Sequence, residues 1–184
     1  MEVKSYTINE KLLLVVDNLL TQEECSYFIQ LLDTDDGLED VDRGFAFYKR
    51  NTLVSEELAQ TLHKRLEPLL TQTIQQPIVL NTHFRFSKYL PGQYFDTHTD
   101  GVNQDEKGRK SFMTINIFLN DNFEGGETDF LDNQKNLVLS AKPVPGRGAI
   151  FDRLIYHRGN VVRGGFKYLI RTDIMYNPLL RLFA

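Results

Sequence analysis

Short apolar runs separated by glycine-containing turns fill the chain from Leu80 onward and most restrict its fold. The runs are rich in Phe, Tyr, Ile and Val, and the separators include Pro-Gly at 91–92, Gly-Gly at 125–126 and PGRG at 145–148. Many short strands joined by such turns are typical of antiparallel β-structure arranged as two facing sheets. The periodicity alone predicts a β-sandwich or barrel and does not choose between them.

The region before Leu80 has a different pattern. KLLLVV at 11–16 indicates a buried strand, and Thr21 with Glu24 matches a capping box at the start of a helix. A second helix is expected to begin at Ser55, and Pro68 is expected to kink or end it. The helical residues predicted to face the core are Cys25, Phe28, Ile29 and Leu32 in the first helix, and Leu58, Leu62, Leu66 and Leu69 in the second.

Length and composition predict one domain over residues 1–184, with helical support at about 1–80 and a catalytic core at about 81–178. The formal net charge of −4 gives no basic footprint for nucleic acid, so no such partner is expected. We find no signal peptide and no apolar run long enough for a bilayer, which favours a reducing cytoplasm. The single cysteine, Cys25, is expected to be a buried structural thiol.

Three residues carry the strongest chemical signal: His98 and Asp100 in FDTHTDG, and His157 in LIYHRGN. A His-x-Asp pair on one strand projects both side chains from the same face, because side chains alternate with period two. A distant second histidine completes the two-His-one-carboxylate set that binds a divalent first-row metal on one side. The residue types alone do not separate Fe(II) from Mn, Co, Ni or Zn.

The surrounding motifs identify a family. RFSKYLPGQYFDTHTDG, FMTINIFLN, GGETDF, PVPGRGAIFD and YHRGNVVRGGFKYLIRTDIMY follow one another between Arg85 and Tyr176. In these motifs the chain resembles the prolyl-4-hydroxylase-like branch of the 2-oxoglutarate- and Fe(II)-dependent dioxygenases. The resemblance implies an α+β, mainly β, double-stranded β-helix (jelly roll) braced by the N-terminal helices. It also selects Fe(II) as the metal, with 2-oxoglutarate and O2 as co-substrates and ascorbate as a compatible accessory reductant. Asp100 argues against the halogenase variant of this chemistry, in which the carboxylate is replaced.

The resemblance also places the contacts of 2-oxoglutarate. Lys167, ten residues after His157, stands where the family has the Lys or Arg that binds the distal carboxylate. Arg171 is the rival, because it shares the face of Lys167 and offers a bidentate fork; its alternative role is to pair with Asp173. Tyr89 is expected to donate to the same carboxylate or to be a core aromatic. Asn116, on the same face as Thr114 and Phe118, contacts 2-oxoglutarate or satisfies a backbone group.

The remaining polar features are expected to lie outside the metal site. His63 is interpreted as a helix-surface or packing residue, and His83 as structural or at most close to the substrate. The polar segments 33–44 and 101–111 are predicted loops that flank the substrate entrance, with plain solvated connections as the alternative.

The predicted activity is hydroxylation of a C–H bond, with proline in a peptide or protein as the first choice of substrate. A free amino acid or another small molecule is the alternative within the same chemistry. Two further classes stay open: a cupin-like metal protein that does not use 2-oxoglutarate, and a non-catalytic interaction module. Lys167 argues against the former and the intact metal set against the latter. No membrane partner is expected, and the sequence leaves the oligomeric state open.

Overall fold

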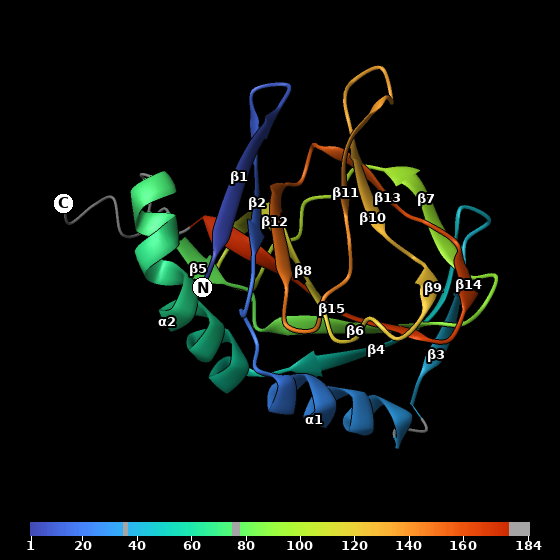
Figure 1. Cartoon of the computed structure of the whole chain (residues 1–184). Coiled ribbons are helices and arrows are strands. Elements are labelled where there is room, and N and C mark those ends of the chain that lie inside the picture. Colours follow the sequence, from blue (N-terminus) through green and yellow to red (C-terminus); the bar gives the residue numbers. More distant parts are fainter. Residues whose placement is uncertain (35–36, 75–77, 177–184) are drawn as a thin grey trace.

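Antiparallel strands make up about half of the structure, a computed structural model that describes residues 1–34, 37–74 and 78–176 (Figure 1). The two helices are α1 (Gln22–Asp33) and α2 (Glu56–Thr73). The strands are β1 (Val3–Ile8), β2 (Lys11–Val16), β3 (Glu39–Asp42), β4 (Ala46–Val54), β5 (Ile78–Leu80), β6 (His83–Tyr89), β7 (Tyr94–His98), β8 (Lys110–Phe118), β9 (Glu124–Gly125), β10 (Thr128–Leu131), β11 (Leu137–Ala141), β12 (Gly148–Asp152), β13 (Tyr156–Gly159), β14 (Val162–Gly164) and β15 (Lys167–Tyr176).

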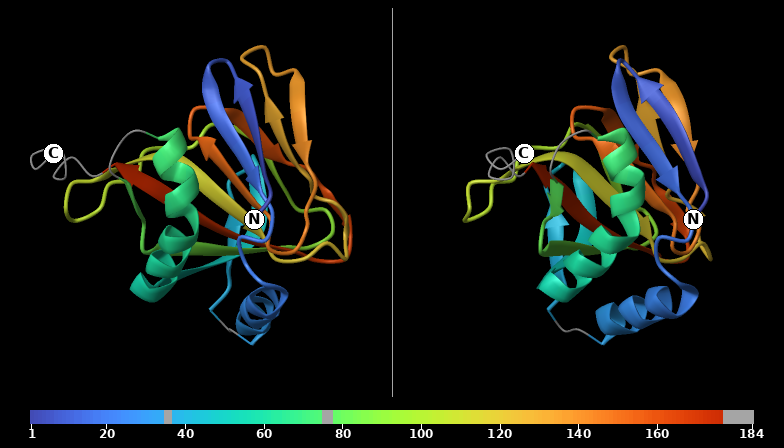
Figure 2. Two further views of the ribbon diagram at one scale, coloured as in Figure 1. Left: turned by 60° about the vertical axis from the view of Figure 1, so that its left-hand side comes forward. Right: turned by 90° about the vertical axis from the view of Figure 1, so that its left-hand side faces the viewer.

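One curved sheet of 13 strands forms a nearly closed barrel, and the helices lie outside it (Figures 1 and 2). Its order is β1-β2-β12-β8-β15-β6-β4-β7-β13-β10-β11, with β3 paired to β4 and β5 paired to β15. Strands β9 and β14 form a separate pair. This is the predicted double-stranded β-helix, a jelly roll braced by helices.

The central strands β6, β8 and β15 separate an apolar layer from a polar interior by strict alternation. Phe84 and Phe86 of β6 pack in the core cluster under the helices, whereas Arg85, Ser87 and Tyr89 line a pocket on the opposite face. Side chains alternate in the same way on β15. Tyr168 and Ile170 pack in the cluster under the helices, and the alternate residues Lys167, Leu169 and Arg171 line the pocket. The alternation of side chains along these strands therefore places the polar residues of the site on one face of the sheet.

Both helix starts are as predicted. In the capping box of α1, Thr21 Oγ1 accepts from the Glu24 amide at 3.2 Å, and the Thr21 amide donates to Glu24 Oε2 at 2.8 Å. Ser55 caps α2 by accepting from the Leu58 amide at 3.1 Å. Strand β2 has the predicted bounds, and Cys25 is buried, with burial raising the pKa of its thiol to about 11.

Pro68 does not end the second helix, so that half of the expectation is wrong; the kink stays a prediction. Helix α2 continues through Pro68 to Thr73. Proline at this position removes the N–H that would bond to the Lys64 carbonyl, but Lys64 and Pro68 both lie on the exposed side of the helix. Water can solvate that carbonyl, and the buried side chains Ala59, Leu62, Leu66 and Leu70 hold the helix against the sheet on either side of the break.

Two parts of the N-terminal region also differ from expectation. The segment 33–44, predicted to be a loop, contains β3, which pairs with β4; residues 35 and 36 of this segment lie outside the described residues. Strands β1, β2 and β4 join the main sheet, so residues before 80 supply sheet as well as helical support. Residues 177 and 178, at the end of the expected core, are also outside the described part. No described helix has the length and apolar character that crossing a membrane requires.

Candidate active site

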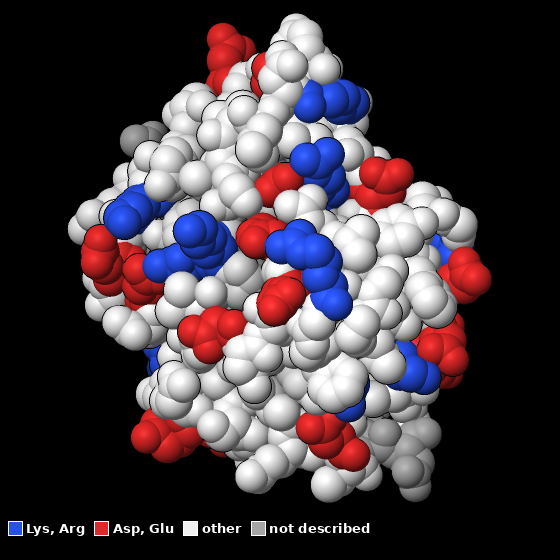
Figure 3. Space-filling model, turned by 45° about the vertical axis from the view of Figure 1, so that its right-hand side comes forward, with Lys and Arg blue, Asp and Glu red and all other residues white. Residues whose placement is uncertain are grey.

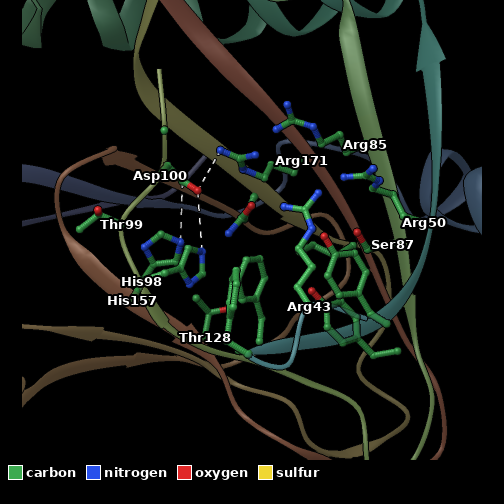
Figure 4. A pocket seen from close by; sticks show the side chains of 18 of the residues that line it. Arg43, Arg50, Arg85, Ser87, His98, Thr99, Asp100, Thr128, His157 and Arg171 are labelled. Carbon is green, nitrogen blue, oxygen red and sulfur yellow. Dashed lines mark ion pairs between the residues drawn. The ribbon is translucent and has the colours of Figure 1, made fainter. Parts of the chain in front are cut away.

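His98, Asp100 and His157 come together at one side of the barrel interior. His98 is the last residue of β7, and it lies opposite His157 of β13 in the antiparallel ladder. Asp100 follows two residues after β7 ends, so the expectation that it shares a strand with His98 is wrong. One ligand atom from each of the three lies within 4.8 Å of the others, and Figure 4 shows both rings beside the Asp100 carboxylate.

Backbone carbonyl groups fix the direction of both imidazole rings. His98 Nδ1 lies 2.7 Å from the Asp96 carbonyl oxygen, and His157 Nδ1 lies 3.0 Å from the Ile155 carbonyl oxygen. A carbonyl only accepts, so each Nδ1 carries the hydrogen and each Nε2 presents a lone pair. The two Nε2 atoms face Asp100, at 3.8 Å from Oδ1 for His98 and 3.7 Å from Oδ2 for His157.

Asp100 is held by three further contacts. Its amide donates to the Arg153 carbonyl at 2.8 Å, and its Oδ2 accepts from Thr114 Oγ1 at 2.6 Å. The guanidinium of Arg171 lies 3.0 Å from Oδ1. The contacts come from the turn after β12, which holds Arg153, and from strands β8 and β15, which hold Thr114 and Arg171. Together they fix the orientation of the Asp100 carboxylate.

The protonation states suit a metal site. Burial and the neighbouring His157 lower the pKa of His98 to about 4, and burial lowers the pKa of His157. Burial opposes ionisation of Asp100, but the Arg171 guanidinium and the Thr114 hydroxyl hold the pKa of this carboxyl below its usual value. Near pH 7 the three side chains are therefore two neutral imidazoles and one carboxylate, the donor set that Fe(II) takes in oxygenases.

A cavity of about 390 Å³ extends from these three residues to Lys167. Lys167 is buried, with 2% of its surface exposed, and its Nζ donates to the Gly126 carbonyl at 2.7 Å. Gly126 has a positive φ of 67°, and a Cβ at this position would lie 3.2 Å from Lys167 Cδ, so a glycine here makes room for the lysine. Burial lowers the pKa of Lys167 to about 8, with Glu127 opposing the shift.

The other residues expected to bind 2-oxoglutarate also line the cavity. Tyr89 is the cross-strand partner of Lys167, whose Nζ lies 5.1 Å from the centre of the Tyr89 ring. Asn116 is buried, and its Oδ1 has no hydrogen-bond partner among the described residues. An unpaired buried amide oxygen beside a cavity is costly unless a ligand or water satisfies it.

The two candidate cations on β15 lie at different places. Lys167 has no carboxylate within ion-pair distance in the described part of the chain, whereas Arg171 contacts Asp100 at 3.0 Å and Asp173 at 3.4 Å. The predicted pairing of Arg171 with Asp173 is thus present. His63 on α2 and the exposed His83 on β6 are both absent from the cavity lining, so neither lies at the metal position.

Sequence reasoning missed several cavity residues. Arg85 and Ser87 had an available signal, because they share the face of Tyr89 on β6. Tyr48 and Arg50 had none, since the region that holds β4 showed no strand pattern. The lining residues not predicted from the sequence include Phe45, Tyr48, Arg50, Arg85, Ser87, Phe95 and Thr128.

Comparison with known proteins decides the family. Residues 84–172 match the family model described as the 2OG-Fe(II) oxygenase superfamily, a span that contains His98, Asp100, His157 and Lys167. The chain belongs to the 2OG-Fe(II) oxygenase superfamily. It is an oxidoreductase, a prolyl-4-hydroxylase-like dioxygenase whose family uses Fe(II), 2-oxoglutarate and O2.

Individual relatives are more distant. A PKHD-type hydroxylase of Crocosphaera subtropica is 25% identical over 173 residues, which cover 86% of this chain and 76% of the relative. The viral collagen prolyl hydroxylase of Paramecium bursaria Chlorella virus-1, solved with 2-oxoglutarate, superposes with a TM-score of 0.67 at 20% identity, covering 90% of this chain and 96% of the viral one. A Trichoplax adhaerens prolyl hydroxylase, in complex with a peptide fragment of the hypoxia inducible factor oxygen degradation domain, has a TM-score of 0.65 at 17% identity, with 94% and 87% covered. At these identities the superpositions establish the shared fold.

Proposed function

We propose that this dioxygenase hydroxylates a proline in a peptide or protein, with Fe(II) on His98, Asp100 and His157 and the distal carboxylate of 2-oxoglutarate on Lys167. The observation that carries the proposal is the convergence of two neutral Nε2 atoms and one carboxylate at the end of a cavity that contains a buried amine.

The described residues fit the metal and the co-substrate. The two imidazoles and Asp100 occupy one side of the metal position and leave the cavity side free for other ligands. Lys167 is a buried cation, and its hydrogen bond to Gly126 among the described residues leaves two of its three donors for an incoming carboxylate. When bound, Fe(II) with 2-oxoglutarate supplies the O2 activation that hydroxylation of an unactivated C–H bond requires.

The protein's own part is orientation. The Asp96 and Ile155 carbonyls hold the two rings with Nε2 toward the metal position. Arg171 and Thr114 each bind one oxygen of Asp100, which fixes the carboxylate and offsets its charge. Asn116 presents an amide oxygen that is unpaired in the described residues, and a water in the cavity can donate to it; we assign its Nδ2, which is a donor, the contact with 2-oxoglutarate.

Stacked aromatic rings form one wall of the cavity. Tyr48 stacks on Tyr89 with ring centroids 4.9 Å apart, and Phe95 stacks on His98 at 3.7 Å. Burial raises the pKa of the Tyr89 phenol, which therefore stays a hydrogen-bond donor. A dry, preorganised wall strengthens electrostatic contacts and limits side reactions with water.

The substrate class rests on the relatives. The viral relative is a collagen prolyl hydroxylase by name, and the Trichoplax prolyl hydroxylase is in complex with a peptide fragment. Both share the fold of this chain, which supports a peptidyl proline here. A free amino acid or another small molecule is the second candidate, and the cations of the cavity beyond Lys167 favour it because they suit an α-carboxylate.

Succinate formation that depends on Fe(II) and 2-oxoglutarate, together with mass spectrometry for a gain of one oxygen, tests this function. The variants His98→Ala, Asp100→Ala and His157→Ala should each lose metal-dependent succinate formation, because each removes a ligand. His83→Ala is the matched control, since His83 is exposed and outside the cavity. Succinate formation by His98→Ala at the wild-type rate would remove His98 from the metal site.

A further inference from the structure

The cavity holds more positive charge than the proposed chemistry uses. Lys167 is assigned to 2-oxoglutarate, and Arg171 is bound to Asp100 and Asp173. Three further arginines remain. Among the described lining residues the cations are Arg43, Arg50, Arg85, Lys167 and Arg171, and the one carboxylate is Asp100.

Arg85 occupies an unfavourable position for a cation. It lies directly opposite Arg171 in the β6–β15 ladder, and like charges at such positions destabilise a sheet. Among the described residues, Arg85 donates a hydrogen bond to the neutral Asn103 Oδ1 at 3.3 Å. Burial and the Arg171 charge lower the pKa of Arg85. Such a charge is costly to the fold, which indicates a role with a ligand.

Arg50 and Arg43 extend this charge along the cavity wall. On β4, Lys49 points outward and pairs with Asp40 at 3.0 Å, but Arg50 points inward and has no ion pair with any described residue. Arg43, in the β3–β4 turn, reaches into the cavity, and Figure 4 shows its guanidinium gathered with those of Arg50, Arg85 and Arg171 away from the two histidines. On the face shown in Figure 3, acidic and basic side chains are interspersed.

We propose that the substrate carries a carboxylate, which Arg43, Arg50 and Arg85 bind while the target carbon faces the metal position. The guanidinium fork matches a carboxylate in shape and charge. The identity of the target as proline rests on the proposed function; the carboxylate requirement rests on the arginines. For a prolyl substrate the carboxylate comes from an acidic neighbour in a peptide or from the α-carboxylate of the amino acid itself.

Binding measurements test this without relying on turnover. The probes are a labelled peptide with glutamate on both sides of its proline and the same peptide with glutamine, then N-acetyl-proline and N-acetyl-prolinamide. Each is titrated into anaerobic enzyme with Fe(II) and saturating 2-oxoglutarate, so that Lys167 is occupied. At least one acidic probe should bind about ten- to a hundredfold more tightly than its neutral partner, the effect of a charge-assisted hydrogen bond. The pair that shows this preference identifies the source of the carboxylate.

Variants then locate the effect. Arg50→Gln and Arg85→Gln should each reduce the preference about tenfold or more, whereas Arg163→Gln, at an exposed position on β14, should keep it. Because Arg85 opposes Arg171, Arg85→Gln should melt at or above the wild-type temperature; a purely structural role would lower it.

Two results would overturn the proposal. One is equal binding of acidic and neutral probes in both pairs. The other is a loss of 2-oxoglutarate affinity in Arg50→Gln and Arg85→Gln with the probe preference unchanged, which would assign these arginines to the co-substrate. Carboxylate-selective binding without hydroxylation of any proline would instead retain the carboxylate site and reject the prolyl function.

Discussion

Lys167 and Arg171 show how two cations on one strand face acquire different roles from their neighbours. Alternation on β15 brings both into the cavity, as the sequence predicts. Arg171 lies across the ladder from Asn116 and reaches the Asp100 carboxylate, whereas Lys167 lies across from Tyr89 in an apolar surrounding. The sequence could place both residues on the face, but the partner of each depends on strands distant in the chain.

The buried Lys167 amine should lower the free energy of unfolding of the enzyme when no 2-oxoglutarate is bound. The pKa of Lys167 falls from 10.5 to about 8, so the unfolded chain binds the proton more tightly than the folded one. The folded state is therefore penalised below pH 8, and the penalty is relieved as the pH rises from about 8 to 10.5. Lys167→Met should be more stable than wild type at pH 7 without 2-oxoglutarate, by up to about 3 kcal/mol. Urea unfolding of both proteins between pH 7 and 10 measures this difference and its decline.

The same substitution should damage co-substrate binding. Lys167→Met is expected to raise the KM for 2-oxoglutarate about ten- to a hundredfold, the effect of one charge-assisted hydrogen bond. Arg171→Met should mainly lower kcat, because it releases Asp100. Steady-state kinetics on both variants separates the roles, and the reverse pattern would assign the distal carboxylate to Arg171.

At the scale of elements, short sequence motifs predicted the helix starts and one strand correctly. The capping box, the Ser55 cap and the strand at 11–16 depend on residues within a few positions of one another. Strand β3 was missed because Glu39–Asp42 is acidic and becomes a strand by pairing with β4. The register that places His157 opposite His98 likewise comes from tertiary pairing across 59 residues of chain, which no local pattern contains.

Segment 101–111, predicted to flank the substrate entrance, is hydrogen-bonded to β15 through Asn103. Asn103 Nδ2 donates to Asp173 Oδ2 at 2.6 Å, and the Asn103 amide donates to Ser111 Oγ at 2.8 Å. Gly101 and Asn103 line the cavity from this segment, and Arg43 lines it from segment 33–44. Both segments therefore border the cavity, and their ordering by substrate stays a prediction.

Asn103→Ala should loosen this segment locally. The change removes a donor from buried Asp173 and an acceptor from Arg85, at a cost of about 1–3 kcal/mol. Amide hydrogen exchange should accelerate in 101–111 and stay unchanged in the distant β10–β11 hairpin. Adding a bound substrate should slow exchange in 101–103 and 43–45 of the wild type. Unchanged exchange in both segments on substrate binding would leave them as solvated connections.

Across the whole molecule, the helices and the cavity lie on opposite faces of the same strands. The larger apolar cluster joins α1 and α2 to the outer face of β6, β8 and β15, and the inner face carries the polar site. Composition and periodicity predicted a helical support and a β-rich remainder but not that β1, β2 and β4 complete the sheet. Substitutions between the helices should therefore change stability and leave the site's chemistry intact.

Arg65 offers the sharpest test of this separation. From α2 it donates two bonds to the Glu24 carboxylate, at 2.8 and 2.7 Å, and one to the Leu19 carbonyl at 2.9 Å. Both side chains are about one-third exposed, so solvent screening limits the ion pair, and Arg65→Met should cost about 1 kcal/mol. Its KM for 2-oxoglutarate should equal that of wild type, the opposite of Lys167→Met. Lys64→Met, at the exposed neighbouring position, is the control and should change neither quantity. A change in KM for Arg65→Met would show that the helices control the cavity, because the loss of this contact would then have reached Lys167 through the sheet.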